Sequence, residues 1–550
     1  MLKPFPFIIG LLFFVACAPS DEDTDHRTVF NYNEMNGVTS LDPAAANSSE
    51  NIWPVNLLFN GLVQMDDQLN VTPSIAKSYS ISSDGLDYTF VLRQDVMFHD
   101  NVCFEGGKGR KVVAGDFEYS YNRLFDSKVS SATTLLGNID KGERTSYKGF
   151  EALNDSVFRI HLKQPFSAFL GVLTMKFFSV LPKEAVDYYR QDFRRNPVGT
   201  GAFVFKDWEE GTKLILIKNP VYFETDSLNQ RLPYLDAVTV SFIKDRETAF
   251  MELLNGKFDM LSGSVSFNTN EVLDKEGNLR DVYQKKFYLQ KQTYLKTDYI
   301  GLLVDENLAL VKESPIRLKA VRQAINYAFD RTKLVKYLQN NLGEPALAGF
   351  IPKGMKSYDP AKVKGYSYDP DKVKALLKEA GYENGKGLPE ITLHITDNYK
   401  EQVEFIQSQL AENNIPVQIS IEKTSVLRQA VNSCEYLLFK KSWVADYADE
   451  ENFMSLFYSK NFSPQGMNYF HYKNPRFDAL FEAAQKESEE SRKISMYQQM
   501  DSLVTADAVF MPLYYDQVVR LVSHRINHLT TNPLNLLNLK TVKKQTGVGK

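Results

Sequence analysis

Three things are missing from this sequence: an excess of basic charge, long apolar runs and the motifs of known catalytic sites. Lysine and arginine number 64 against 68 aspartate and glutamate, so the formal net charge is -4. Without a basic surplus to meet a phosphate backbone, we do not expect nucleic acid as a partner. The N-terminal apolar run at 5–15 has about eleven residues, short of the roughly 20 that a membrane-spanning helix needs.

Motifs of enzymes and of metal sites do not occur either. There is no Gly-x-Ser-x-Gly elbow and no His-Glu-x-x-His helix, and the glycines at 199–201 and 381–387 lack the context of a phosphate-binding loop. His524 and His528 lie in a stretch expected to be extended, where a spacing of four residues puts them about 13 Å apart, too far to share a metal. We therefore expect no enzymatic activity, no bound metal and no cofactor.

The N-terminus is typical of an exported lipoprotein. Lys3 and the apolar run at 5–15 indicate a signal peptide, which ends in a cysteine, Cys17, in a context that resembles the lipobox of acylated proteins. An ordinary secretory signal with an incidental cysteine is the alternative. Residues 18–27 are polar, acidic and without periodicity. We predict a lipoprotein signal peptide at 1–17 with lipidated Cys17, a flexible acidic tether at 18–27, and export to the cell envelope with a lipid anchor in the membrane.

The organisation of the chain is multi-domain. Its 550 residues exceed what one core supports and indicate about three or four structural units. Near the start, residues 28–32 form a β-rich run and residues 51–63 have helical spacing of apolar positions. Strands are predicted at 86–93 and 157–162, as partners within one small domain, with a helix at 114–125 between them.

The later segments predict an α/β arrangement. A hairpin is expected around Gly211, followed by a strand at 238–243. Further along, Asp369 is placed to cap a helix that ends before Gly381. Strand, helix and strand then alternate through residues 391–421.

Ten short segments, in order and across about 450 residues, are similar to the extracellular solute-binding proteins of the oligopeptide- and dipeptide-binding type, family 5. Each segment alone is a weak signal. Together, in the same order as in the family, the ten segments are a specific one. The clearest are Leu41-Asp42-Pro43, Phe59-Asn60-Gly61-Leu62, Asn196-Pro197-Val198-Gly199-Thr200-Gly201, Lys218-Asn219-Pro220-Val221-Tyr222-Phe223 and Val321-Arg322-Gln323-Ala324-Ile325-Asn326.

This resemblance implies an α/β, periplasmic-binding-protein-like fold of two lobes with an additional small inserted α+β domain. The ligand is expected to be enclosed between the lobes of a monomer. The first lobe should comprise residues 28–70, 196–295 and 505–540, the inserted domain residues 71–195, and the second lobe residues 296–504.

Residues 443–447, Trp-Val-Ala-Asp-Tyr, match the family segment whose aspartate pairs with the α-ammonium of a bound peptide. All peptides share their charged ends and backbone, so a protein indifferent to side chains must recognise those features. A carboxylate held against an ammonium forms a charge-assisted hydrogen bond, which strengthens when lobe closure excludes water. We therefore select Asp446 as the residue that holds the amino end. The alternative is that Asp446 caps a turn after a strand at 437–439.

The resemblance also suggests further ligand-binding residues, namely Trp443, Ala445, Tyr447, Lys440, Asn47, Ser49 and Tyr514. Lys440 lies where some relatives have an arginine for the ligand's carboxylate; the alternative is that the lysines at 440 and 441 are ordinary surface residues. The acidic run at 449–451, where Glu450 replaces the family's proline, is expected to be a solvated loop, with a selector for cationic ligands as the alternative. Cys103 and Cys434 are expected to be separate thiols, with a bridge between them as the alternative.

The sequence therefore predicts the substrate-binding component of an ABC importer. It would capture short peptides in extended conformation between two closing lobes and deliver them to a membrane permease and its ATPase. With only three tryptophans to stack on sugar rings, peptide is favoured over oligosaccharide. The alternatives are a protein of the same fold for another solute, such as a nickel chelate, haem or an oligosaccharide, and a peptide-sensing surface lipoprotein without transport.

Overall fold

The computed structural model describes residues 27–130, 132–140, 149–263 and 266–545. The predicted signal peptide at 1–17, with Cys17, and all of the predicted tether except Arg27 lie outside the described residues. Of the helices in the described ranges, none combines the length and the apolar character that a membrane crossing requires.

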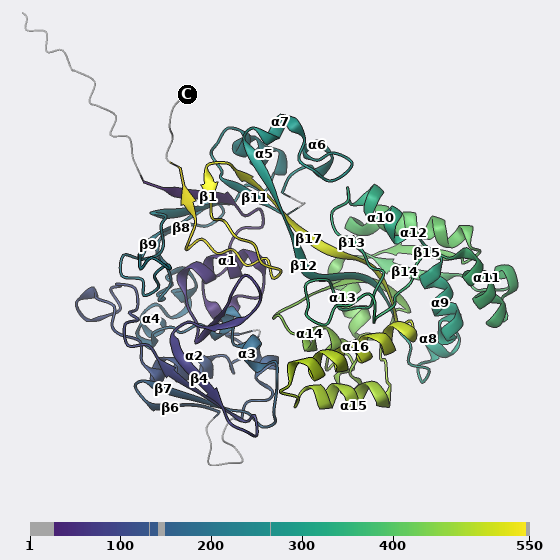
Figure 1. Cartoon of the computed structure of the whole chain (residues 1–550), viewed down its shortest axis with the longest axis horizontal. Coiled ribbons are helices and arrows are strands. Elements are labelled where there is room, and N and C mark those ends of the chain that lie inside the picture. Colours follow the sequence, from purple (N-terminus) through teal and green to yellow (C-terminus); the bar gives the residue numbers. More distant parts are fainter. Residues whose placement is uncertain (1–26, 131, 141–148, 264–265, 546–550) are drawn as a thin grey trace, which may run out of the picture.

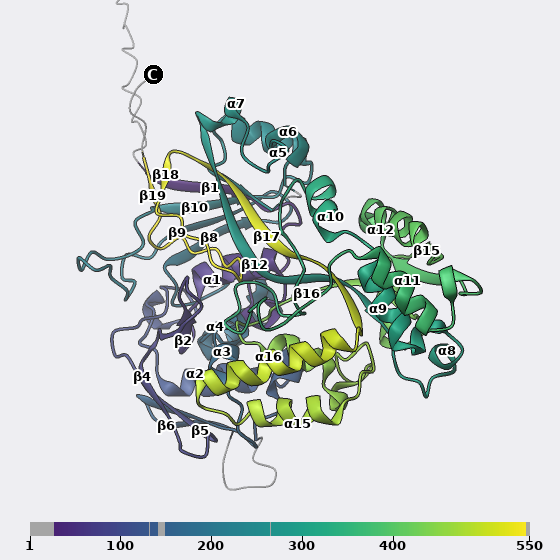
Figure 2. The same ribbon diagram turned by 45° about the vertical axis from the view of Figure 1, so that its right-hand side comes forward.

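One large sheet runs through the molecule and joins its two lobes. In the described part of the chain it has 11 strands, in the order β15-β14-β16-β12-β17-β11-β1-β10-β9-β8, with β13 paired to β17. The long strands β12 (Phe287–Leu302) and β17 (Phe510–Ser523) pair in antiparallel fashion and pass from one lobe to the other (Figures 1 and 2). The two-lobed α/β architecture predicted from the sequence is confirmed.

The first lobe is built around a short parallel pair of strands. β1 (Val29–Asn33) pairs in parallel with β10 (Ala237–Ser241), and the predicted hairpin around Gly211, which has a φ of +78°, is confirmed. Only a residue without Cβ adopts that turn at no steric cost. The other elements of this lobe are α1 (Ser49–Leu58), β2 (Val63–Met65), β8 (Phe203–Glu209), β9 (Lys213–Lys218), α5 (Arg246–Leu254), β11 (Met260–Ser262), α6 (Thr269–Val272), α7 (Asp281–Gln284), β18 (Ile526–Asn527) and β19 (Lys543–Lys544).

The inserted part forms a four-stranded antiparallel sheet covered by helices. Strand β5 (Asp87–Leu92) pairs with β7 (Val157–His161), which confirms the predicted partnership. Phe117 of α2 packs on Phe158 in the same continuous core that contains Phe30 of β1. The inserted part therefore shares its core with the first lobe. Its other elements are β3 (Val71–Pro73), β4 (Ala76–Ile81), α2 (Ala114–Arg123), β6 (Phe150–Asn154), α3 (Phe169–Val172) and α4 (Lys183–Tyr189).

The second lobe packs helices on both sides of the other half of the sheet. As predicted, the side chain of Asp369 caps α11 (Pro370–Glu379), accepting a hydrogen bond of 3.0 Å from the backbone N–H of Lys372. The other elements are α8 (Ala309–Lys312), α9 (Lys319–Tyr327), α10 (Arg331–Leu338), β13 (Glu344–Pro345), β14 (Ile391–Ile395), α12 (Lys400–Glu412), β15 (Val417–Ile421), α13 (Thr424–Asn432), β16 (Leu438–Val444), α14 (Glu451–Met454), α15 (Pro475–Ala484) and α16 (Glu490–Ala506).

Candidate functional site

The segment 443–447 leaves the central sheet at the end of β16. Trp443 is still in register with Thr297 of β12, and the backbone N–H of Ala445 donates to the carbonyl of Leu295 at 2.8 Å. The side chain of Asn452, on α14, then accepts hydrogen bonds from the indole Nε1 of Trp443 at 2.9 Å and from the backbone N–H of Asp446 at 3.3 Å. The loop that carries Asp446 is thus fixed at both its ends.

Asp446 projects a carboxylate that is left without a cation. Its side chain is exposed, and no lysine or arginine of the described residues forms an ion pair with it. The surrounding protein nevertheless reduces its hydration and raises the pKa of the carboxyl group, against a smaller lowering by Asn452. Asn452 accepts the hydrogen bond from the backbone N–H of Asp446, and no backbone N–H of the described residues is found donating to the Asp446 carboxylate, as the alternative role of a turn cap would require.

Tyr447 places this loop at a contact between the lobes. Its side chain is only 5% exposed, and its ring lies against Gly171 of α3, in the core shared by the first lobe and the inserted part. A second contact is formed by Ser167, whose backbone N–H and hydroxyl donate to the carbonyls of Gln485 and Ala484 at 3.0 and 3.1 Å. Asp446 therefore lies beside the line along which the lobes meet.

A cavity of about 970 Å³ lies between the inserted part and the second lobe. It begins next to the loop, at Ala448, and extends along the contact made by Ser167. Its walls combine apolar and charged side chains, which suits a ligand with both kinds of surface. The larger of these side chains are Tyr79, Tyr88, Phe166, Leu170, Met355, Lys356, Glu450, Lys486 and Lys493.

The acidic run after the loop is buried, so the expectation of a solvated loop is wrong. Asp449 forms an ion pair of 2.6 Å with Lys493, and Glu450 accepts a hydrogen bond of 2.8 Å from the backbone N–H of Ser357. Glu451 accepts a hydrogen bond from the hydroxyl of Tyr447, and burial raises its pKa to about 7. These carboxylates fasten α14 to its surroundings because each has a partner.

Lys440 is buried and paired, so its interpretation as a surface lysine is wrong. Its ammonium lies 2.6 Å from Asp298 of β12, and both side chains are 0% exposed. Lys296 approaches the same carboxylate at 3.0 Å and Asp516 at 2.7 Å. We call these four residues the Asp298 cluster. Burial raises the pKa of Asp298, but the two lysines outweigh it and hold that pKa below its usual range.

The remaining predicted residues divide between this cluster and the first lobe. Tyr514 is buried on β17 directly opposite Asp298, so it lies with the Asp298 cluster. Asn47 and Ser49 are exposed at the start of α1, on the other lobe from Asp446. The structure therefore brings together Trp443, Ala445, Asp446 and Tyr447, and it does not place the others in that loop.

One residue near α1 was not predicted from the sequence. Glu34 directly follows β1, and burial, helped by the nearby Glu50, raises its pKa to about 7, although a hydrogen bond from the backbone of Asn36 opposes this. A carboxyl group with a pKa raised in this way is one feature that functional sites share. The only signal in the sequence was an acidic residue immediately after a strand.

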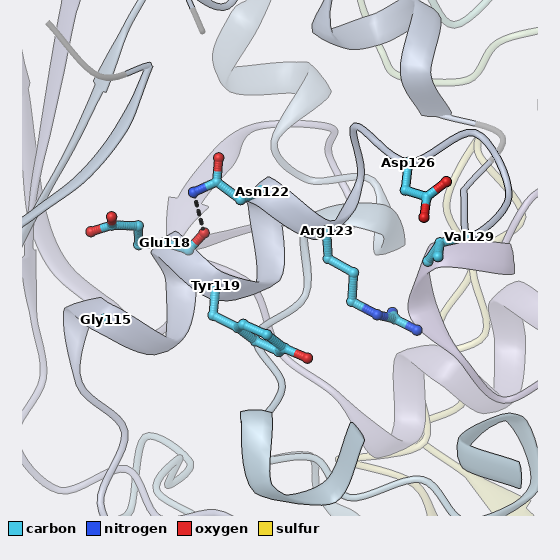
Figure 3. Close-up of a pocket in the computed structure, with 7 residues that line it drawn as sticks. All are labelled: Gly115, Glu118, Tyr119, Asn122, Arg123, Asp126 and Val129. Carbon is cyan, nitrogen blue, oxygen red and sulfur yellow. Dashed lines mark hydrogen bonds between the residues drawn. The ribbon is translucent and has the colours of Figure 1, made fainter. Parts of the chain in front are cut away.

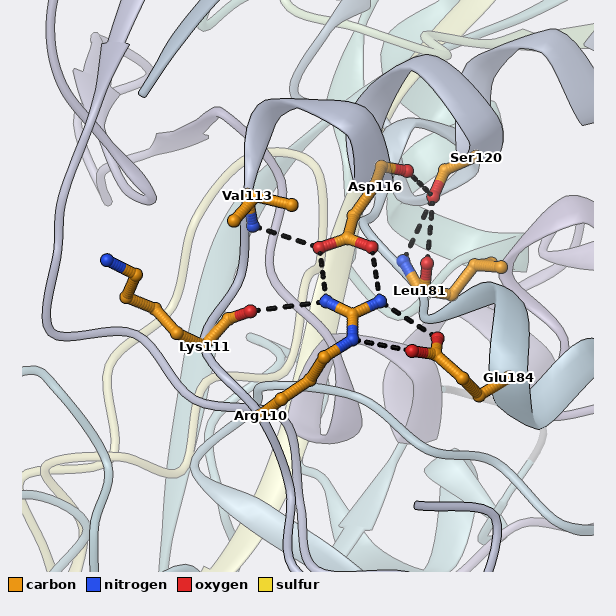
Figure 4. A network of polar contacts seen from close by, with 7 residues as sticks. All are labelled: Arg110, Lys111, Val113, Asp116, Ser120, Leu181 and Glu184. Atoms are coloured by element: carbon orange, nitrogen blue, oxygen red, sulfur yellow. Dashed lines mark hydrogen bonds and ion pairs between the residues drawn. The ribbon is translucent and has the colours of Figure 1, made fainter. Parts of the chain in front are cut away.

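Two features of the inserted part are structural and lie away from this loop. Arg110 donates hydrogen bonds to Asp116 of α2, at 2.7 and 2.9 Å, and to Glu184 of α4, at 2.6 and 2.8 Å. Figure 4 shows the guanidinium between the two carboxylates, where it ties the two helices together. A hollow of about 510 Å³ runs along α2, and Figure 3 shows the residues that line it. Its Arg123 is already paired with Asp42 at 2.5 Å. The hollow is lined by one helix and the turn after it, so we do not select it as the site. Its lining is Gly115, Glu118, Tyr119, Asn122, Arg123, Asp126 and Val129.

Comparison with known proteins identifies the family. Residues 70–465 match the middle region of the bacterial extracellular solute-binding proteins, family 5. The dipeptide-binding protein DppE of Bacillus subtilis is 25% identical over 95% of this chain and 93% of its own length, and the glutathione-binding protein GsiB of Pectobacterium atrosepticum is 28% identical over 91% of each. The periplasmic binding protein DppA of Helicobacter pylori, solved with the peptide STSA, is 26% identical and superposes with a TM-score of 0.75 over 94% of this chain and 99% of its own. The chain therefore belongs to the bacterial extracellular solute-binding proteins of family 5.

Proposed function

We propose that this chain is the peptide-binding component of an ABC importer. It captures short peptides in extended conformation between its lobes and delivers them to a membrane permease, whose ATPase partner uses ATP. The names of its relatives support this ligand class, because a dipeptide-binding protein, glutathione-binding proteins and a protein solved with a bound peptide all match over nine-tenths or more of this chain. The acylated Cys17 would anchor a monomer to the membrane of the cell envelope.

The observation that carries the proposal is the unpaired carboxylate of Asp446. In the described structure its charge is partly dehydrated but is not balanced by a lysine or arginine. A peptide's α-ammonium supplies the missing cation and donates up to three hydrogen bonds, and it is present in every peptide whatever its side chains. Because Asp446 lies beside the contact between Tyr447 and Gly171, closure of the lobes on a ligand would further exclude water and strengthen this pair.

The other predicted residues have separate places in this proposal. Trp443 and Tyr447 would flank the amino end, and Asn47 and Ser49 would reach the ligand from the first lobe. Lys440 and Tyr514 would act at the carboxyl end only if the ligand reached the Asp298 cluster, where the ammonium of Lys440 is already engaged. The cavity between the inserted part and the second lobe leaves room for side chains beyond the recognised ends.

Calorimetry with one peptide in three forms tests the proposal. Acetylation of the amino end removes the ammonium, so the N-acetylated peptide should bind roughly tenfold to 100-fold more weakly than the free peptide. The same peptide amidated at its carboxyl end is the matched control, because it loses a charge but keeps the ammonium. Equal affinities for the free and N-acetylated forms would contradict the role of Asp446.

A further inference from the structure

A thiol, an imidazole and a carboxylate meet in the second lobe, away from the loop at 443–447. Cys434 lies in the short connection between α13 and β16, and its Sγ is 3.0 Å from Nε2 of His471. On the other side of the ring, Nδ1 of His471 lies 3.6 Å from a carboxylate oxygen of Asp305. Ser463 completes the group, with its hydroxyl 3.2 Å from Nε2 and 3.5 Å from Sγ.

The surroundings of His471 favour its doubly protonated form. Nε2 lies 2.9 Å from the backbone carbonyl of Ser463, and a carbonyl can only accept a hydrogen bond. The ionised carboxylate of Asp305, facing Nδ1, can also only accept. Both ring nitrogens are therefore placed as donors. Burial lowers the pKa of His471, but its contacts with Cys434, Ser463 and Asp305 outweigh burial and raise that pKa.

The orientation of the imidazole is fixed by packing. The ring of Phe462 stacks on it with 4.3 Å between the ring centres and 9° between the planes. The His471 side chain is only 12% exposed, whereas Cys434 as a residue is half-buried. The stacked ring therefore holds Nε2 in place beside the sulfur.

The thiol of Cys434 is in a setting that favours its ionised form. Burial raises its pKa, but hydrogen bonding to His471 and Ser463 and the charge of His471 outweigh burial and lower it, while Asp305 opposes them. Cys103 provides the contrast within the same chain, because burial and the nearby Glu184 raise its pKa to about 11. Both are free thiols, as expected from the sequence. No group of three or more ligands for a metal ion is found among the described residues.

We propose that Cys434 is a reactive thiolate, held by the imidazolium of His471, which exchanges with low-molecular-weight disulfides. The thiolate sulfur attacks one sulfur of the small disulfide, a new bond forms between Cys434 and that half, and the other half leaves as a thiolate that takes a proton from water. The protein sulfur is oxidised to a mixed disulfide, the small disulfide is reduced, and His471 keeps its proton. The inference is independent of peptide binding, because Cys434 and Asp446 lie beyond opposite ends of β16.

The test is the rate at which the full chain reacts with a neutral small disulfide, bis(2-hydroxyethyl) disulfide. Aliquots are quenched with acid, digested and analysed by mass spectrometry, so that the peptides of Cys17, Cys103 and Cys434 are measured separately. At pH 7 we expect Cys434 to form the mixed disulfide at least about tenfold faster than Cys103. A rate at Cys434 equal to or below that at Cys103 would overturn the proposal.

Two further measurements separate ionisation of the thiol from its accessibility. In the wild-type chain, the reaction rate at Cys434 is measured as a function of pH. It should stop rising before the pH reaches the ordinary thiol pKa of about 8.5. The His471→Gln variant keeps a hydrogen-bond donor but has no positive charge. In this variant the increase of the Cys434 rate with pH should move to higher pH, and the reaction at pH 7 should be about tenfold slower. The rate at Cys103 should stay unchanged. A wild-type rate that still climbs through pH 8.5 would refute the imidazolium's role, and this result does not depend on the variant folding.

Discussion

Asp298 and Asp446 belong to the same lobe and have opposite surroundings. Asp298 is fully buried between Lys440 and Lys296, whereas Asp446 reaches the solvent and has no cationic partner in the described part of the chain. Accordingly the pKa of Asp298 is lowered and that of Asp446 is raised. The comparison teaches that a carboxylate whose charge is balanced inside the protein serves the fold, while one left unbalanced beside a contact between lobes is available to a ligand.

The Asp298 cluster should dominate stability, so Lys440→Met is expected to have the largest effect. The substitution leaves a buried carboxylate with one of its two cations, and breaking a buried pair in this way costs about 3–5 kcal/mol. We expect a loss of unfolding free energy near the lower end of that range, because Lys296 remains. Urea unfolding followed by circular dichroism measures it.

The double variant Lys440→Met with Asp298→Asn is the control for this prediction. It removes both charges of the pair and leaves Lys296 with Asp516, so it should recover more than half of the lost stability. If Lys440→Met alone stays within about 1 kcal/mol of wild type, the buried pair is not the stabilising unit that its burial indicates.

Local features of the fold were predictable, and contacts between distant segments were not. The cap at Asp369 and the turn at Gly211 depend on residues within a few positions of each other, and both were confirmed. The pair of Lys440 and Asp298 joins strands that are 142 residues apart in sequence, so nothing near Lys440 signals its burial. The acidic run at 449–451 was misread for the same reason, because Lys493 and Ser357, its partners, are remote in the chain.

The candidate site was predictable only as far as its motif extends. Residues 443–447 were selected together because they are contiguous, and the structure shows that Asn452 holds them in one loop. Asn47, Ser49 and Tyr514 come from other segments of the chain, whereas Lys440 lies on the same strand as Trp443 but pairs with Asp298. Glu34 was missed because its raised pKa arises from burial, which sequence patterns around β1 do not encode.

The second prediction concerns ligand affinity and uses Asp446→Asn. The amide keeps the shape of the side chain but cannot balance an ammonium, so the affinity for a free peptide should fall by roughly tenfold to 100-fold. Stability should change by less than about 0.5 kcal/mol, since the residue is exposed. Calorimetry and urea unfolding on the same preparation measure both quantities.

The matched control is Asp371→Asn, at a side chain that is 95% exposed on α11. It removes one negative charge from the same lobe without touching the loop, so the peptide affinity should not change. If Asp446→Asn binds the peptide as tightly as Asp371→Asn does, the ammonium is held elsewhere.

The smallest expected effect is the pH dependence of stability, and there the two aspartates should differ in sign. The lowered pKa of Asp298 means that its charge stabilises the folded state above the unfolded pKa, and this stability is lost as the pH falls through the folded pKa. The raised pKa of Asp446 means that its charge opposes folding above the folded pKa, and the penalty disappears below the unfolded value of about 3.9.

At pH 7, Asp298→Asn should therefore destabilise the protein and Asp446→Asn should stabilise it slightly, by no more than a few tenths of a kcal/mol because solvent screens the exposed carboxylate. Urea unfolding at decreasing pH should show the Asp446 difference shrinking between pH 7 and about pH 4, while the Asp298 difference persists to about pH 4 and shrinks only below it. Two variants that shift stability in the same direction at pH 7 would show that the contrast between a balanced and an unbalanced carboxylate does not hold.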